Sequence, residues 1–203
     1  QLVPTAARSQ QDQPEAEALA PPADLEELLR QANEGQSAAI RTDFYGAFWG
    51  VRAFGGQLFD EEGRVVLNQG GLANWLGWLK LAQNNPHIVL NRNPDELLLL
   101  FTTGKATYYV GSTQELPGLQ EALGEELVGA VRLPGRPNNP AGPFLQAEAL
   151  MFNSASTGES TELALRLAQY LTNAEQQRKL ALSVGKLPTN KRVNIDPRVS
   201  PIV

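Results

Sequence analysis

The sequence predicts an α/β fold in which helices flank a mixed sheet. Segments with apolar residues at helical spacing alternate along the chain with short segments of high strand propensity. Glycine, proline and asparagine separate most of these segments, which indicates many short elements rather than a few long ones. With 203 residues, 42% of them hydrophobic, the chain is long enough for one large domain or two small lobes.

Helices are predicted where apolar residues recur every three or four positions between a capping residue and a stop signal. Seven segments fit this description: 24–33, 44–54, 72–83, 94–101, 112–123, 161–171 and 173–184. Asp24 with Glu27, and Thr172 with Glu175, are predicted to form capping boxes. Gly185 is predicted to end the last helix, because glycine reaches the left-handed conformation without a steric penalty.

Strands are predicted where β-branched and aromatic residues concentrate between turn signals. The predicted strands are 37–40, 106–110, 127–133 and 145–152, with a hairpin whose arms are 58–59 and 65–67. Residues 60–63 make the hairpin turn, and the proline-rich segment 134–143 is a loop. Residues 1–20 are predicted to be a short extended piece, Leu2 to Ala7, followed by a solvated linker, and the segment after Leu187 to be an irregular tail.

Composition and motifs argue against several classes of function. A net charge of −5 without a basic block makes nucleic acid an unexpected partner. Without cysteine the chain has no disulfides, thiol catalysis or thiolate metal sites, and no metal or cofactor is expected. The single histidine, His87, lacks a serine-elbow motif elsewhere, and Lys105 lacks the glycine and hydroxyl neighbours of a phosphate-binding loop. The sequence therefore predicts a protein that is not an enzyme.

Aromatic residues dominate the stretch Asp43–Asn68, around which we expect the chain to be organised. Phe44 and Tyr45 come directly after Asp43 at the start of a helix, a position where side chains lie in a cleft about as often as in a core. Trp49 is intermediate between the two locations, and Trp75 is predicted to be core because it shares a helical stripe with Leu72, Leu76 and Leu79. Exposed rings of this kind stack on the apolar faces of sugars.

Several segments occur in an order that resembles extracellular solute-binding proteins of the maltose-binding type, which serve ABC importers. The aromatic helix leads into Gly-Gly and a hairpin, and Phe101–Gly111 holds a Phe-x-x-Gly-Lys-Ala segment before a strand. A Leu-Pro strand end and a proline-rich loop follow, then Tyr-Leu-Thr-x-x-Glu at Tyr170–Glu175 and Gly-x-x-Pro-Thr-Asn at Gly185–Asn190. The resemblance covers roughly residues 21–190.

This resemblance implies a periplasmic-binding-protein type II-like fold, with two lobes and a solute between them. It implies a sugar-like small-molecule solute, a membrane permease as partner, no cofactor, and a periplasmic or extracellular location, with a membrane tether outside this chain as one option. The ligand-binding residues that it implies are Phe44, Tyr45, Trp49, Ser112 and Gln114. At Ser112 to Gln114, where many members carry a Pro-Trp pair, this sequence has no aromatic residue.

The resemblance also predicts how the chain is divided. Its segments are an extended segment and linker (1–20), a second-lobe-like α/β domain (21–147), a returning strand and helices of the first-lobe type (148–190) and a tail (191–203). Most of the first lobe is then expected to be missing from this chain. Two non-enzymatic functions stay open: a sugar-binding component of an importer, or a degenerate lobe that acts as an interaction or scaffold domain on a transporter or other complex.

Overall fold

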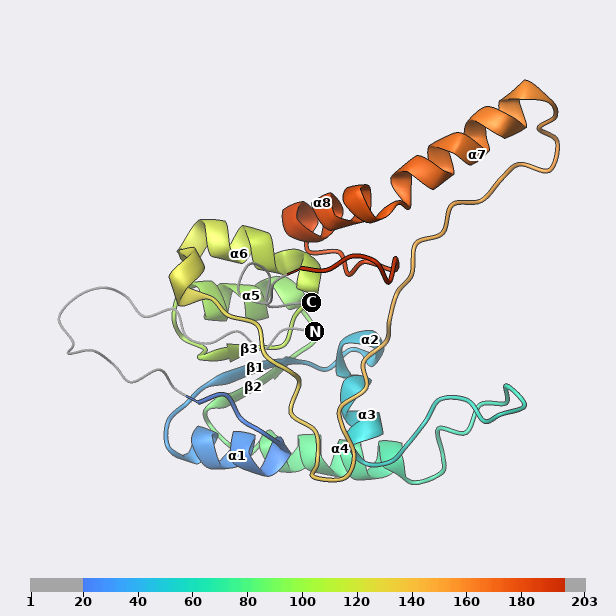
Figure 1. Cartoon of the computed structure of the whole chain (residues 1–203). Helices are drawn as coiled ribbons and strands as arrows, with labels where there is room; N and C mark the ends of the chain where they lie inside the picture. The colour runs from blue at the N-terminus through green and yellow to red at the C-terminus, as the bar shows by residue number, and fades with distance from the viewer. Residues whose placement is uncertain (1–19, 196–203) are drawn as a thin grey trace. The chain divides into compact units, whose positions relative to one another are not determined.

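The structure, a computed structural model, describes residues 20–195 (Figure 1). The chain divides into two compact units, unit 1 (Gln1–Phe144) and unit 2 (Leu145–Val203). The extended piece predicted at Leu2 to Ala7 and the last part of the predicted tail, 196–203, lie outside the described residues.

Unit 1 contains the sheet and most of the helices. Its elements among the described residues are α1 (Leu25–Asn33), β1 (Ala38–Arg41), α2 (Phe44–Ala47), α3 (Trp49–Ala53), α4 (Gly71–Ala82), β2 (Ile88–Asn91), α5 (Pro94–Thr102), β3 (Tyr108–Tyr109), the 3₁₀ helix η1 (Thr113–Glu115), α6 (Leu116–Leu123) and the 3₁₀ helix η2 (Glu125–Leu127). The described elements of unit 2 are α7 (Glu159–Leu171) and α8 (Ala174–Val184). The predicted α/β fold class is confirmed.

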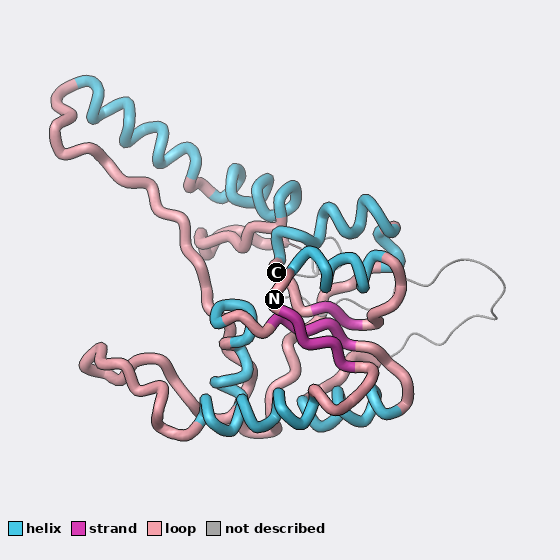
Figure 2. The backbone as a smooth tube through the Cα atoms, turned by 180° about the vertical axis from the view of Figure 1, so that it is seen from behind, coloured by secondary structure: helices cyan, strands magenta, loops and turns pink. Residues whose placement is uncertain are grey.

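The sheet of unit 1 has the strand order β2-β1-β3, and β1 is parallel to both neighbours. Its register pairs Ala39 with Val89 on one side and with Tyr109 on the other. Figures 1 and 2 show α1 and α4 on one face of this sheet and α5 and α6 on the other. All strands of the described sheet are therefore parallel, whereas the sequence predicted a mixed sheet, because the connections between its strands are helical crossovers rather than hairpins.

Three tryptophans form the centre of the core of unit 1. The ring of Trp75 lies 4.8 Å from that of Trp49 and stacks on that of Trp78 at 5.0 Å between centroids. Trp75 is buried, which confirms its prediction as a core residue. The helical stripe is rotated relative to the prediction, because Trp78 is 9% exposed and Leu76 is 54% exposed. Trp78 takes the inward position because it stacks on Trp75 across one helical turn.

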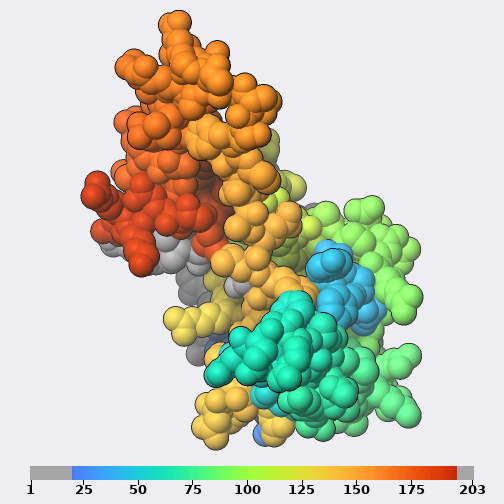
Figure 3. All heavy atoms as spheres, turned by 90° about the vertical axis from the view of Figure 1, so that its right-hand side faces the viewer, coloured from blue at the N-terminus to red at the C-terminus, as the bar shows by residue number. Residues whose placement is uncertain are grey.

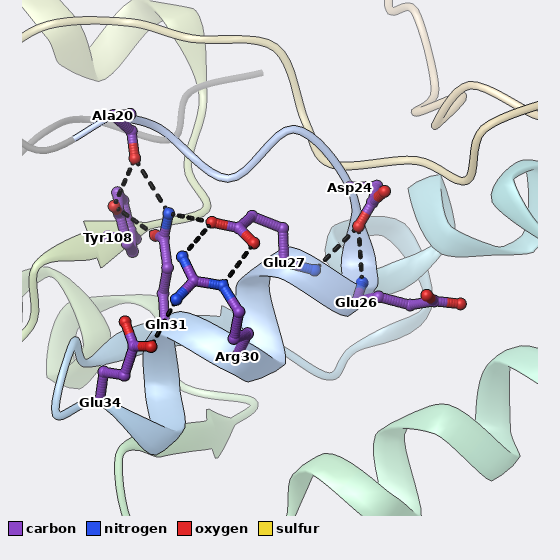
Figure 4. Close-up of polar contacts among 8 residues, drawn as sticks. All are labelled: Ala20, Asp24, Glu26, Glu27, Arg30, Gln31, Glu34 and Tyr108. Carbon is purple, nitrogen blue, oxygen red and sulfur yellow. Dashed lines mark hydrogen bonds and ion pairs between the residues drawn. The ribbon is translucent and has the colours of Figure 1, made fainter.

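The start of α1 is held by a polar network that reaches the sheet (Figure 4). Asp24 caps the helix by accepting hydrogen bonds from the backbone N–H groups of Glu26 and Glu27 at 2.9 and 2.8 Å. The predicted capping box is wrong for Glu27, whose carboxylate accepts instead from Arg30 at 2.7 Å and from the side chain of Gln31 at 2.9 Å. Gln31 is buried and accepts a 2.7 Å hydrogen bond from the hydroxyl of a tyrosine on β3, Tyr108.

The predicted aromatic helix is two short helices, α2 and α3, because the hydrogen-bond ladder is interrupted at Phe48. Gly55 follows α3 with a φ of 74°, a left-handed conformation that glycine adopts without a steric penalty. The predicted hairpin is reduced to a single antiparallel bridge between Phe59 and Val65, with Gly63 at a φ of 76° in the turn. This segment is the teal patch at the lower centre of Figure 3.

Two predicted strands are wrong and one strand was not predicted. The predicted strands 127–133 and 145–152 are not formed: Leu127 belongs to η2, and no described strand lies alongside the remaining residues to complete a ladder. β2 was not predicted. It has four residues and is defined by its hydrogen-bond ladder to β1.

Unit 2 is built from α7, α8 and the chain that follows them. Asn173 caps α8 by accepting from the backbone N–H of Gln176, so the capping box predicted for Thr172 is wrong. Gly185 ends α8 at a φ of 63°, as predicted. The backbone of Asn190 donates to Gln177 at 2.7 Å, which ties the following segment to the helix. Within residues 20–195, no helix has the length and hydropathy needed to cross a membrane.

Candidate functional site

The predicted site residues follow the carboxyl ends of two neighbouring strands. Phe44 and Tyr45 come three and four positions after the last residue of β1, and Ser112 comes three after that of β3. Because β1 and β3 are parallel, these positions lie at the same edge of the sheet. The crossovers from β1 to β2 and from β2 to β3 use helices on opposite faces, so the β1–β3 boundary is the topological switch point at which α/β sheets bind ligands.

A cluster of four aromatic rings lies at the start of α2; we call it the ring platform and define it as Phe44, Tyr45, Phe48 and Phe144. Phe44 is 49% and Tyr45 is 75% exposed, and their ring centroids lie 5.8 Å apart in an edge-to-face arrangement. Phe144 lies 5.8 Å from Phe44 and 5.7 Å from Tyr45. Two rings of the platform therefore present their surfaces to solvent.

Phe48 and Phe144 are the less exposed rings of the ring platform. Phe48 is buried and stacks on Phe144 with a centroid distance of 4.2 Å and an interplanar angle of 20°. The segment before Phe144 is attached to α3, because the backbone N–H of Gly142 donates to the carbonyl of Trp49 at 3.0 Å. The sequence did not predict Phe144 as a site residue, since no local signal connects it with α2.

Trp49 lies in the core rather than in the ring platform. It is 1% exposed and packs against Trp75, so its ring offers no surface to a solute. Its location follows from the break at Phe48, after which α3 turns Trp49 toward the sheet side of α4. Its backbone carbonyl accepts the hydrogen bond from Gly142, and its ring is not part of the exposed surface.

Arg41 and Asp43, beside the ring platform, are paired with each other. Arg41 donates to Asp43 at 2.7 Å, and Asp43 also caps α2 by accepting from the backbone N–H of Gly46 at 3.1 Å. Burial acts to raise the pKa of Asp43, but the hydrogen bonds from Arg41 and Gly46 outweigh it and hold this pKa below its ordinary value. The carboxylate therefore stays ionised and engaged within the protein.

Ser112 and Gln114 lie at the start of η1 and are both exposed. Ser112 accepts from the backbone N–H of Gln114 at 3.3 Å and donates its own backbone N–H to Glu115 at 2.6 Å, which forms a capping box. The side-chain amide of Gln114 is exposed, and it makes no hydrogen bond with the described residues. The structure places both residues after β3, and their described hydrogen bonds are with each other and with Glu115.

Comparisons with known proteins agree with this architecture. Residues 5–200 match the family model for bacterial extracellular solute-binding proteins. The chain belongs to this family. No curated protein sequence matches it.

Solved structures similar to this member of the family include proteins bound to maltose, maltotriose and acarbose. Maltose-bound MalE3 of T. maritima has a TM-score of 0.69 at 22% identity, over 90% of this chain and 51% of that one. The maltotriose-bound MalE domain of Bdellovibrio bacteriovorus has a TM-score of 0.67 at 20% identity, over 99% and 54%. The GacH receptor of Streptomyces glaucescens, solved unliganded and with acarbose, has a TM-score of 0.70 at 15% identity, over 91% and 49%. The predicted maltose-binding-type fold is confirmed, and the chain spans about half the length of these proteins.

A hollow of about 340 Å³ lies elsewhere along the same edge of this solute-binding fold. It is lined by residues of α4, β2 and the end of β1: Thr42, Leu76, Leu79, Lys80, Gln83 and Leu90. None of the five predicted site residues lines it. Among residues 20–195, no three His, Cys, Asp or Glu side chains are grouped so that they could hold a metal ion.

Proposed function

We propose that this chain is the solute-recognition part of a non-catalytic binding protein that supplies a sugar-like solute to an ABC importer. The observation that carries the proposal is the pair of exposed rings, Phe44 and Tyr45, at the switch point of the parallel sheet. The sugars bound by the similar structures support the same class of solute.

The chemistry of the ring platform favours a neutral solute with apolar faces. Pyranose rings carry C–H faces that stack on aromatic rings, and their hydroxyls need nearby polar groups. The platform supplies the rings, and the Tyr45 hydroxyl with the Gln114 amide supplies polar groups at the same edge of the sheet. Beside the platform, Asp43 and Arg41 form an ion pair and neutralise each other.

The partners and the location follow from membership in the family and are part of the proposal. A periplasmic or extracellular protein that recognises a solute would pass it to a membrane permease. Recognition would use Phe44, Tyr45 and Gln114, with Ser112 shaping the backbone that presents Gln114. Trp49 contributes from the core by supporting the segment that leads to Phe144.

Calorimetric titration of the chain with maltose, maltotriose and acarbose tests the proposal. We expect weak binding, because the ring platform is open to solvent and covers one side of a solute. Tyr45→Ala should weaken it by roughly tenfold, as expected for the loss of a stacked ring. The matched control is Tyr170→Ala, which removes a tyrosine that is also exposed but belongs to α7 in unit 2.

The result decides between the two functions left open by the sequence. Binding that Tyr45→Ala abolishes and Tyr170→Ala leaves intact supports solute recognition at the ring platform. Binding that neither substitution changes would move the site elsewhere on the molecule. If no sugar binds, the proposal of sugar recognition is wrong, and a degenerate lobe with an interaction or scaffold function becomes the better account.

A further inference from the structure

Phe144 is distant from α2 in sequence but contacts every other ring of the ring platform. It lies 5.8 Å from Phe44, 5.7 Å from Tyr45 and 4.2 Å from Phe48. It is also half-buried, between the exposed pair and the buried Phe48. Phe144 is thus the ring through which the exposed pair is connected to the core.

The local structure of α2 is too short to fix the orientation of Tyr45. α2 has four residues, about one turn, and an isolated turn of helix is not stable by itself. Tyr45 is 75% exposed, and no hydrogen bond from its hydroxyl to another described residue is present. The aromatic neighbours Phe44 and Phe144 are therefore what restricts its rotation.

Phe144 itself is held from two directions. Its ring stacks on Phe48 with an interplanar angle of only 20°. Two residues earlier, Gly142 hydrogen-bonds Trp49, and a Cβ at Gly142 would lie 2.5 Å from the side chain of Arg52. Position 142 lies so close to α3 that only glycine, which has no Cβ, fits there. This contact holds in place the backbone two residues before Phe144.

From these contacts we infer that Phe144 is a positioning residue for solute binding: it orients Tyr45 before the solute arrives. The inference rests on the proposed function, in which Tyr45 stacks on the solute. A ring already held in its bound orientation loses less conformational entropy on binding, so support of this kind raises affinity without a contact to the solute.

A double-mutant cycle in the full chain tests the inference with maltotriose as the probe. Phe144→Leu should weaken binding about three- to tenfold, the range expected from losing an aromatic pair. In the background of Tyr45→Ala the same substitution should have almost no effect, because the ring that it positions is absent. Phe144→Tyr should restore affinity. The control, Phe59→Leu, changes an exposed phenylalanine in the hairpin that is not part of the ring platform, and it should be neutral.

A second measurement does not need a solute. In chain labelled with ¹³C-tyrosine, the ring signal of Tyr45, assigned with Tyr45→Phe, should show faster ring motion by NMR relaxation in Phe144→Leu than in the parent. Phe59→Leu should leave this motion unchanged, and circular dichroism checks that each variant is folded. The other three tyrosines, Tyr108, Tyr109 and Tyr170, serve as internal references.

The outcomes separate this inference from the proposed function. If maltotriose binds and Phe144→Leu acts independently of Tyr45→Ala, the positioning role is overturned while sugar recognition stands. If no sugar binds but the ring of Tyr45 becomes more mobile in Phe144→Leu, the proposed function fails and the positioning of Tyr45 stands. Unchanged ring motion in a folded Phe144→Leu variant overturns the inference in either case.

Discussion

Gly50 is a residue at which the core of unit 1 leaves almost no room for a side chain. A Cβ at this position would lie 2.3 Å from the Trp75 ring, which is itself fixed between Trp49 and Trp78. Close packing of this kind leaves no direction in which the ring can give way, because protein interiors are as dense as organic crystals. A single hydrogen atom as side chain therefore permits α3 to pack directly on α4.

The substitution Gly50→Ala should destabilise the protein by about 1–3 kcal/mol through overpacking. Gly77→Ala is the matched control, since Gly77 lies in α4 with nothing within 4 Å of the added Cβ. It should stabilise the helix by roughly 0.5–1 kcal/mol, because alanine has the higher helix propensity. Urea unfolding followed by tryptophan fluorescence measures both. Equal effects of the two substitutions would contradict the packing described for Trp75.

Tyr108 should make stability depend on pH at the alkaline end. Burial, with a smaller effect of Glu27, raises the pKa of Tyr108 to about 12, against about 10 for an unfolded tyrosine. The folded state holds this proton more tightly, so the contribution is complete below pH 10 and is lost as the pH rises from 10 to about 12. Between pH 9 and pH 12, the free energy of unfolding measured by chemical denaturation should fall less steeply with pH for Tyr108→Phe than for the parent. Parallel curves would show that the phenol does not ionise with unfolding.

Among the elements, α1 shows how a local signal and a distant contact combine. Asp24 caps the helix through its carboxylate, and its backbone pairs with Gly135 in an isolated bridge. The backbone N–H of Leu25 donates to the Gly135 carbonyl at 2.9 Å. The proline-rich loop thus reaches the first turn of α1, which neither segment indicates by itself.

Removing the cap with Asp24→Ala should cost about 1 kcal/mol of stability, because two backbone N–H groups lose their acceptor. Asp24→Asn keeps an acceptor oxygen at the same place and should cost much less. Chemical denaturation at neutral pH measures the difference. A loss of equal size in both variants would assign the effect to charge rather than to capping.

Of the two units of the molecule, unit 1 has a large core and unit 2 has a small core. α4 and α7 have 12 and 13 residues, so length alone predicts similar stability. They differ in packing: α4 buries Trp75 and Trp78, whereas none of the residues of α7 is buried. Tertiary burial rather than helix propensity should therefore set their relative stability.

Hydrogen exchange followed by mass spectrometry checks this expectation. Amides of α7 should exchange well before those of α4 at the same pH and temperature, because opening α7 exposes little buried apolar surface. The measurement should be repeated at several protein concentrations, since association between copies would also protect exposed leucines such as Leu163 and Leu167. Equal protection of the two helices at the lowest concentration would contradict the expectation.

Much of the helical part of this protein was predictable from short-range patterns. Asp24 and Gly185 occupy the ends of α1 and α8 that the sequence indicated, because capping depends on residues within one turn. The exposure of Phe44 and Tyr45 was one of two alternatives that the sequence left open. Whether these rings bind a solute stays a prediction.

By itself, the sequence determined the fold class, most of the helix ends and the family, because these depend on local patterns and their order along the chain. Only the tertiary structure decided that 127–133 and 145–152 form no strand, that Ile88–Asn91 does, and that Phe144 joins the rings of α2. A strand exists only beside a partner, and a ring platform exists only where distant segments meet. Both depend on contacts between residues far apart in the chain, which no local pattern encodes.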